Sequence, residues 1–362
     1  MLKSLLAAAL LATTANALPA IAAENTLRLT MIDADGGAAA LFVTPEGKSL
    51  LVDTGWPSDM PQDKPAADGT LPPPPPAATI DRIVAAMKRL NVTRLDHVLI
   101  THYHLDHVGG VHDILARIPV GEFIDHGPNR EMAPASGATW DHPVALFKRY
   151  QAAIAGHKRR AVKVGDVVNI GSLKMTIVAG DGQVLRRGLP GARPVGMRCD
   201  TPDKANANDE NSHSLGFLAT FGKTRILDLG DLTWNEEKRL VCPIDRLGPV
   251  DVLLVTHHGS ELSNNPALVN TVQPRLALVA NGARKGGDAA VFETLSTTPS
   301  RPPIWYQHLA TRSPAANAIS DRIANQTLDP DGAYSLDVAI EASGVLRVTN
   351  TRNGYTETLP AR

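Results

Sequence analysis

The decapeptide Thr101-His102-Tyr103-His104-Leu105-Asp106-His107-Val108-Gly109-Gly110 is the most informative part of this sequence. It follows the apolar run 97–100, which is predicted to be a strand. His102 and His104 are two residues apart, so both side chains can face one way from an extended chain. Asp106 and His107 follow as the chain turns, and the two glycines permit a tight turn into a helix. Three imidazoles and a carboxylate within six residues favour binding of a borderline metal such as zinc.

Strand and helix patterns alternate on both sides of this cluster. Mixed elements without a clear linker indicate one α/β domain of two sheets with helices outside. Strands are predicted at residues 26–31, 41–43, 49–53, 97–100, 123–124, 174–178, 215–220, 224–229, 252–256, 276–279, 335–339 and 346–348. Helices are predicted at residues 80–90, 111–118, 144–155, 234–240, 266–272 and 289–295.

The run His102-x-His104-x-Asp106-His107, preceded by Val52-Asp53-Thr54-Gly55, resembles the metallo-β-lactamase superfamily. The resemblance implies a single-domain, four-layer αββα sandwich with a metal centre at the edge of the sheets. Three later motifs are similar to the hydrolase domain of ComEC-type DNA-uptake proteins and their stand-alone relatives. They are Asn211-Ser212-His213-Ser214-Leu215, Leu227-Asp228-Leu229-Gly230-Asp231 and Leu254-Val255-Thr256-His257-His258-Gly259-Ser260.

The same resemblance implies two divalent metal ions, zinc in the first instance and manganese as the alternative. His102 and His104 would hold the first ion, and Asp106 and His107 the second. Asp231 would bridge the two, because a carboxylate can span cations that lie roughly 3.5–4 Å apart.

Three assignments around these ligands stay open at this stage. His257 is predicted to bind the second ion and His258 to lie behind it or donate a proton, but the two roles could be exchanged. His213 either completes the first site or is an exposed loop histidine. Asp53 is either the outer carboxylate that orients a ligand imidazole or a plain turn residue.

The resemblance implies a hydrolase whose nucleophile is a hydroxide bridging the two ions, with Asp106 and His258 contributing to catalysis. A phosphodiester substrate, such as a nucleic acid or a nucleotide, is the leading hypothesis. A lactone, carboxylic ester or β-lactam is the alternative on the same centre, although Asp231 counts against a true β-lactamase. A third interpretation is a non-catalytic metal-binding protein.

Charge and composition restrict these possibilities. With 36 Lys and Arg against 37 Asp and Glu, the whole chain has no field that would hold nucleic acid. A basic segment at residues 151–198 nevertheless contains nine Lys and Arg against two Asp. That segment either attracts an anionic substrate or is a solvated surface hairpin.

The two cysteines, Cys199 and Cys242, cannot supply a thiolate zinc site; they either pair with each other or are separate buried thiols.

The N-terminus has the pattern of a secretory signal peptide. Residues 1–23 combine Lys3, an apolar run and small residues at the end, and they are predicted to be removed on export. The hydrolase domain is then expected at residues 24–357, with a proline-rich loop at 56–79 and no membrane span in the mature chain. A secreted or periplasmic location follows, while the oligomeric state has no signature in the sequence.

Overall fold

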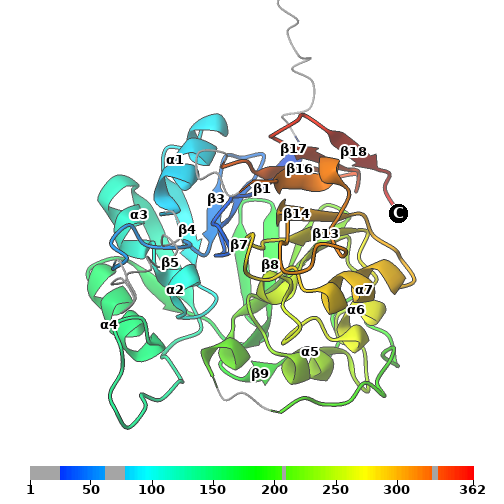
Figure 1. Cartoon of the computed structure of the whole chain (residues 1–362), viewed down its shortest axis with the longest axis horizontal. Coiled ribbons are helices and arrows are strands. Elements are labelled where there is room, and N and C mark those ends of the chain that lie inside the picture. The colour runs from blue at the N-terminus through cyan, green and yellow to red at the C-terminus, as the bar shows by residue number, and fades with distance from the viewer. Residues whose placement is uncertain (1–24, 62–77, 206–208, 328–332) are drawn as a thin grey trace, which may run out of the picture.

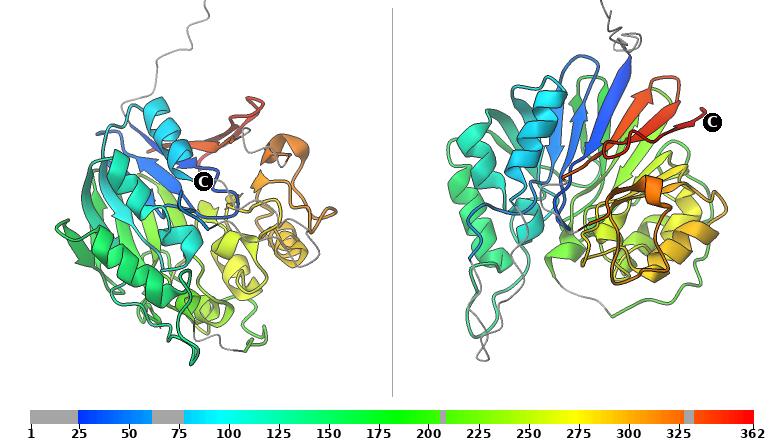
Figure 2. Two further views of the ribbon diagram at one scale, coloured as in Figure 1. Left: turned by 60° about the vertical axis from the view of Figure 1, so that its left-hand side comes forward. Right: turned by 45° about the horizontal axis from the view of Figure 1, so that its top comes forward.

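The computed structural model describes residues 25–61, 78–205, 209–327 and 333–362. Two mixed β-sheets pack face to face, and helices cover the outer face of each sheet (Figure 1). Figure 2 shows the two helical layers on opposite sides of the pair of sheets. This is the predicted four-layer αββα sandwich. The predicted signal peptide and the prolines at 72–76 lie outside the described residues.

The first sheet has the described strand order β18-β17-β16-β1-β2-β3-β4-β5-β6. Strands β3, β4 and β5 are parallel neighbours, so their carboxyl ends meet at one edge. The strands are β1 (Thr26–Met31), β2 (Ala40–Val43), β3 (Ser49–Val52), β4 (Leu95–Leu99), β5 (Val120–Asp125), β6 (Arg159–Ala161), β16 (Leu336–Glu341), β17 (Leu346–Asn350) and β18 (Thr356–Leu359).

The second sheet has the described order β15-β14-β13-β12-β11-β10-β8-β7, with β9 paired to β8. Here β11 to β15 are parallel neighbours and form a second common carboxyl edge. The strands are β7 (Val167–Ile170), β8 (Leu173–Gly180), β9 (Gln183–Val184), β10 (Gly216–Phe221), β11 (Thr224–Asp228), β12 (Val252–Leu254), β13 (Leu276–Val279), β14 (Ile304–His308) and β15 (Ile323–Asn325).

Alternation along the strands separates the apolar side chains into distinct cores. In β2, Phe42 joins the core between the sheets, whereas Leu41 and Val43 join the core beneath the first helical layer. Phe42 meets Phe217 of the second sheet edge-on, with ring centroids 6.5 Å apart. Each such large side chain contributes about 1.5–3 kcal/mol on burial, so the sheet-to-sheet core is a main source of stability.

The helices fall into two sets. The first sheet is covered by α1 (Ile80–Arg89), α2 (Leu105–Val108), α3 (Val111–Arg117) and α4 (Pro143–Ala153). The second is covered by α5 (Trp234–Val241), α6 (Pro266–Val272) and α7 (Ala289–Thr297). Local sequence explains where two of these helices begin. Helices α4 and α6 each have proline in the first turn, and the N-cap residues His142 and Asn265 accept a backbone hydrogen bond through their side chains.

The sequence did not predict β6, β7, β9, β14, β15 or β18 as strands. Most of these are short or lie at a sheet edge, where few residues show the two-residue alternation. Strand β14 is different, because it is buried along its whole length and therefore has no polar face to alternate with.

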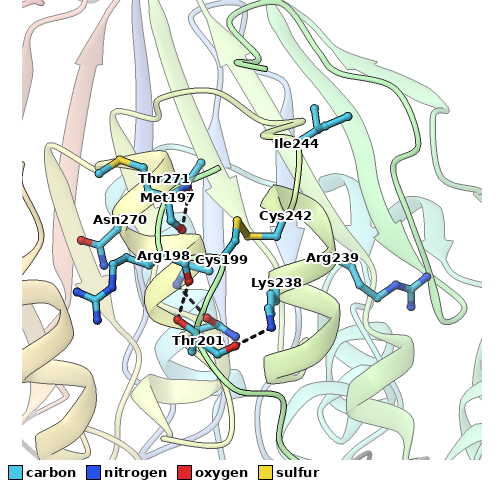
Figure 3. The surroundings of a disulfide bond; sticks show 12 residues. Met197, Arg198, Cys199, Thr201, Lys238, Arg239, Cys242, Ile244, Asn270 and Thr271 are labelled. Atoms are coloured by element: carbon cyan, nitrogen blue, oxygen red, sulfur yellow. Dashed lines mark hydrogen bonds between the residues drawn. A yellow bond between two sulfur atoms is a disulfide. The ribbon is translucent and has the colours of Figure 1, made fainter. Parts of the chain in front are cut away.

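Cys199 and Cys242 form a disulfide with an S–S distance of 2.01 Å, which decides the alternative left open by the sequence. The bond joins the long segment after β9 to the residue that ends α5 (Figure 3). The same end is also held by Lys238 Nζ, which donates to the carbonyl of Thr201 at 2.6 Å.

Four of the nine basic residues of segment 151–198 form ion pairs within the described fold. Arg159 pairs with buried Asp125, and Arg160 and Lys158 both pair with Glu122. Arg193 pairs with Asp245 in the same way. These four cations therefore have structural partners. Among the described residues, no helix is long and apolar enough to cross a bilayer.

Candidate metal centre

The residues singled out in the sequence converge where the carboxyl edges of the two sheets meet. The His102–His107 motif follows β4, Asp231 follows β11, and His257 and His258 follow β12. Two backbone hydrogen bonds join these segments: Leu215 N donates to Thr101 O at 2.8 Å, and His257 N donates to Gly230 O at 3.0 Å. Ligand sites in α/β proteins characteristically form at such carboxyl edges.

Four buried residues form the centre of the cluster. One ligand atom each of Asp106, His107, Asp231 and His258 lies within 4.8 Å of the other three. His107 Nε2 is 3.1 Å from His258 Nε2 and 3.3 Å from an oxygen of each aspartate. Nitrogen lone pairs and carboxylate oxygens that converge in this way form a donor set suited to a divalent cation.

His102 and His104 lie beside this group as a second pair. His102 Nε2 is 3.0 Å from His104 Nδ1 and 3.9 Å from Asp231 Oδ2. His102 is fully buried, whereas the His104 side chain is 27% exposed. The pair therefore places two imidazole nitrogens close together, with His102 Nε2 near Asp231.

Asp231 is the carboxylate that lies near four imidazoles, those of His102, His107, His257 and His258. Its Oδ2 atom is 3.3 Å from His107 Nε2 and 3.5 Å from Nε2 of both His257 and His258. Gly230 allows this approach: its φ is +56°, and a Cβ there would lie 2.8 Å from Thr101 Cβ. A side chain at that position would push Asp231 away from the first sheet.

His257 and His258, whose roles the sequence left exchangeable, have different surroundings in the structure. His258, not His257, belongs to the four-residue cluster, with its Nε2 atom 3.0 Å from Asp106 Oδ2. His257 instead places Nδ1 3.2 Å from Ser263 Oγ and remains partly exposed. Both residues have left-handed backbone angles, with φ values of +54° and +56°. The two side chains therefore do not follow the alternation of an extended chain.

Neighbouring imidazoles and a lysine keep the carboxyl groups of Asp106 and Asp231 ionised. Burial alone would raise the pKa of Asp231, but His107, His257 and His258 outweigh it and keep this pKa well below its usual range. Burial is likewise opposed at Asp106, whose pKa is lowered by Lys285 and His107. Both carboxylates are thus available as anionic ligands at neutral pH.

Asp53 lies directly behind His107. Its Oδ2 atom accepts a hydrogen bond from His107 Nδ1 at 2.7 Å, while Thr101 donates to both of its oxygens through N and Oγ1 at 2.8 Å. The contact fixes which nitrogen of His107 faces the cluster. This is the geometry of a carboxylate that orients a ligand imidazole.

Glu131 has a corresponding position behind His104, and no motif in the sequence pointed to it. Glu131 Oε2 lies 3.6 Å from His104 Nε2, and Oε1 lies 3.5 Å from His142 Nε2. Burial lowers the pKa of His104, but the contact with Glu131 outweighs this and raises it. Glu131 follows β5, so knowing that β5 is parallel to β4 would have marked this loop as a candidate.

Lys285 was the other omission. It follows β13, and its Nζ atom forms an ion pair with Asp106 Oδ2. Trp56 lies beneath the ammonium group, with 5.4 Å from Nζ to the ring centroid. The sequence offered no signal for this lysine beyond its glycine-rich surroundings.

The remaining candidates have other contacts. His213 Nδ1 contacts the carbonyl of Asp209, and among the described contacts of His213 none involves the cluster. His126 pairs with Glu210 at 2.8 Å, and His308 pairs with Asp33 at 2.6 Å. These are buried imidazole–carboxylate pairs outside the centre.

Comparison with known proteins agrees with the geometry. The model of the metallo-beta-lactamase superfamily matches residues 33–204. A hydroxyacylglutathione hydrolase of Cupriavidus metallidurans is 34% identical over 232 residues, which cover 56% of this chain and 80% of that protein. Recombination protein 2 of Haemophilus influenzae is 34% identical over 82 residues, covering 23% of this chain and only 10% of its own length.

Solved structures with related folds are more distant in sequence. A metallo-beta-lactamase fold protein from Bacillus subtilis is 12% identical and covers 78% of this chain and 96% of its own, with a TM-score of 0.44. Rm3 metallo-beta-lactamase is 14% identical over 65% of this chain and 80% of its own, with a TM-score of 0.38. On the family model and the hydrolase relative, this chain belongs to the metallo-beta-lactamase superfamily and is a metal-dependent hydrolase.

Proposed function

We propose that this protein hydrolyses phosphodiesters with two divalent ions held at the described cluster. His102, His104 and Asp231 would hold the first ion, and Asp106, His107, His258 and Asp231 the second. When bound, such a pair supplies Lewis-acid polarisation of the substrate and an activated water at neutral pH.

The observation that carries this proposal is the position of Asp231 Oδ2. It lies 3.3–3.9 Å from an imidazole nitrogen of His102, His107, His257 and His258. A carboxylate shared by two sets of ligands suits a pair of ions, and two ions held there would suit an in-line displacement at phosphorus.

The chain's own groups have separate tasks in this reaction. Asp53 and Glu131 orient His107 and His104 through their outer nitrogens. His257 is outside the four-residue cluster and its side chain is 12% exposed, with Nε2 towards Asp231. Burial lowers the pKa of His257, so near neutral pH its imidazole would take up a proton at Nε2 from the attacking water rather than supply one. No serine or cysteine nucleophile is required.

A second candidate function is hydrolysis of a thioester or carboxylic ester, with lactones and β-lactams included. The specific observation in its favour is the 34% identity over 232 residues to hydroxyacylglutathione hydrolase. Both reactions use the same ligands, so only the substrate separates them.

A substrate panel tests the proposal. Protein loaded with zinc or with manganese is assayed with bis(p-nitrophenyl) phosphate, a lactone, a thioester and nitrocefin, with the Asp231→Asn variant as control for contaminating activity. We expect the phosphodiester to be cleaved fastest, with the activity lost in the variant. Turnover confined to the thioester or lactone would favour the second candidate. Metal analysis of the same samples gives the ion bound and its number per chain.

Export is a separate part of the proposal, and it is supported by the signal-peptide pattern at residues 1–23. The whole chain, expressed in a bacterial host, should be recovered outside the cytoplasm with a new N-terminus near residue 23 or 24. Mass spectrometry of the purified protein reads that terminus directly. Recovery of the intact N-terminus in the cytoplasm would contradict export.

A further inference from the structure

Lys285 lies at the edge of the metal-binding cluster and has no role in the proposed ligand set. Its Nζ atom pairs with Asp106 Oδ2, while the side chain remains 40% exposed. An ammonium group has three N–H donors, so the contact with Asp106 leaves donors facing solvent at the mouth of the site.

The backbone holds this lysine firmly against the site. Gly287 N donates to His258 O at 2.9 Å, and Gly282 N donates to Lys285 O at 2.9 Å. A Cβ on Gly286 would lie 2.1 Å from His258 O, so only glycine fits between the loop and that carbonyl. Lys285 is therefore positioned by the same segment that carries His258.

The aromatic face of Trp56 fixes the other side of the ammonium group, at 5.4 Å from Nζ to the ring centroid. A cation over an aromatic face is held without losing its N–H donors. Trp56 is itself anchored, because its Nε1 donates to the carbonyl of Asp35 at 3.3 Å. The result is a cation aimed at the site between a carboxylate and a ring.

We propose that Lys285 binds the charged phosphoryl oxygen of the substrate and makes the site selective for anionic over neutral substrates. This inference rests on the proposed phosphodiesterase function and names the residue that recognises its substrate class. The competing role is purely structural, in which Lys285 only neutralises Asp106.

Three variants separate the two roles. Lys285→Met removes the cation and keeps the length of the side chain, whereas Lys285→Arg retains the charge. Arg284→Met is the matched control, because it removes the same charge from the adjacent, exposed position. Each is assayed with bis(p-nitrophenyl) phosphate, an anion, and with p-nitrophenyl acetate, a neutral ester.

We expect Lys285→Met to lower kcat/KM for the phosphodiester about 10- to 100-fold, the range for one hydrogen bond to a charged group. Its activity on the neutral ester should change less than about 3-fold. Lys285→Arg should restore most of the loss, and Arg284→Met should change neither substrate. Equal losses on both substrates, together with loss of bound metal, would overturn the proposal in favour of the structural role.

Binding of inorganic phosphate provides a readout that does not depend on turnover. Titration calorimetry on metal-loaded protein should give a Kd about 10- to 100-fold higher for Lys285→Met and unchanged for Arg284→Met, at equal metal content. Unchanged phosphate affinity in Lys285→Met would overturn the role of Lys285. This outcome is distinct from failure of the proposed function, which is a wild-type protein that binds phosphate through Lys285 yet does not cleave the diester.

Discussion

Asp231 and Glu237 are two buried carboxyl groups, six residues apart, that have opposite ionisation. Asp231 is 4% exposed and Glu237 is fully buried. The imidazoles around Asp231 overcome burial and hold its pKa well below normal, whereas burial raises the pKa of Glu237 to about 8. Glu237 Oε2 accepts only neutral donors, such as Asn265 N at 2.7 Å.

The difference shows that burial by itself favours a proton on a carboxyl group, and that only a concentration of cationic or metal-binding partners reverses this. Glu237 joins α5 to the start of α6, which is a structural role. Asp231 lies among ligands. Replacing each carboxyl group by the neutral amide should therefore affect different properties at the two positions.

The largest effect is expected at Asp231. The Asp231→Asn variant should lose at least about a thousandfold in kcat/KM, since metal contributions are worth several kcal/mol of transition-state stabilisation. Steady-state kinetics combined with metal analysis measures it. Asp228→Asn, three residues away, is the control: burial raises the pKa of Asp228 to about 7, so a neutral amide changes it less. Similar losses in both variants would remove the special role of Asp231.

The two neighbouring histidines give the next comparison. His258→Ala should weaken metal binding by at least about 100-fold, because it removes a member of the cluster and not an outer partner. His257→Ala should keep most of the metal but lower kcat. Competition with a chelator measures affinity, and kinetics on loaded protein measures kcat. The reverse pattern would support the roles predicted from the sequence, in which His257 binds the second ion and His258 lies behind it or donates a proton.

A variant of Asp53 tests whether the carboxylate behind His107 contributes to metal binding. Asp53→Asn should weaken metal binding about 10- to 100-fold, because His107 would lose the acceptor that orients it. The same chelator competition measures this. Asp33→Asn is the control, since Asp33 forms a similar buried pair with His308 outside the cluster. Equal metal loss in the control would point to general destabilisation.

The smallest effect on function, but a clear one on stability, is expected at Glu237. Its folded pKa of about 8 exceeds the ordinary value of 4.5, so the folded state holds its proton more tightly than the unfolded state. The protonated carboxyl group of Glu237 therefore contributes its full share to the free energy of unfolding below about pH 4.5. That contribution, a few kcal/mol, is lost as the pH rises to about 8.

Glu237→Gln should remove that loss. Thermal unfolding of the variant and the wild-type protein, followed between pH 5 and pH 9, should show a difference in melting temperature that shifts in favour of the variant as the pH rises. Kinetic parameters per bound metal should be unchanged. A difference that is independent of pH would contradict the raised pKa.

The site could be predicted from the sequence only where its residues are close in the chain. His102 to His107 are brought together by one strand end and one turn, so their spacing carries the geometry. Asp231 was found by its motif, but its contact with His102 depends on Gly230 and on the packing of the two sheets. The roles of His257 and His258 could not be decided from the sequence, because their placement depends on left-handed backbone angles that spacing does not reveal.

By itself, the sequence determined much of the alternation of strands and helices, since apolar periodicity and turn residues act locally. The four-layer fold was implied by the resemblance of the motifs to the metallo-β-lactamase superfamily. The sequence also determined the ligand types, because two cysteines leave only histidine and carboxylate for the metal. Tertiary structure alone decided the pairing of Cys199 with Cys242 and the placement of Glu131 and Lys285. The two cysteines meet because the segment after β9 packs against the end of α5, and Glu131 and Lys285 reach the cluster because they follow parallel strands that end at its edge.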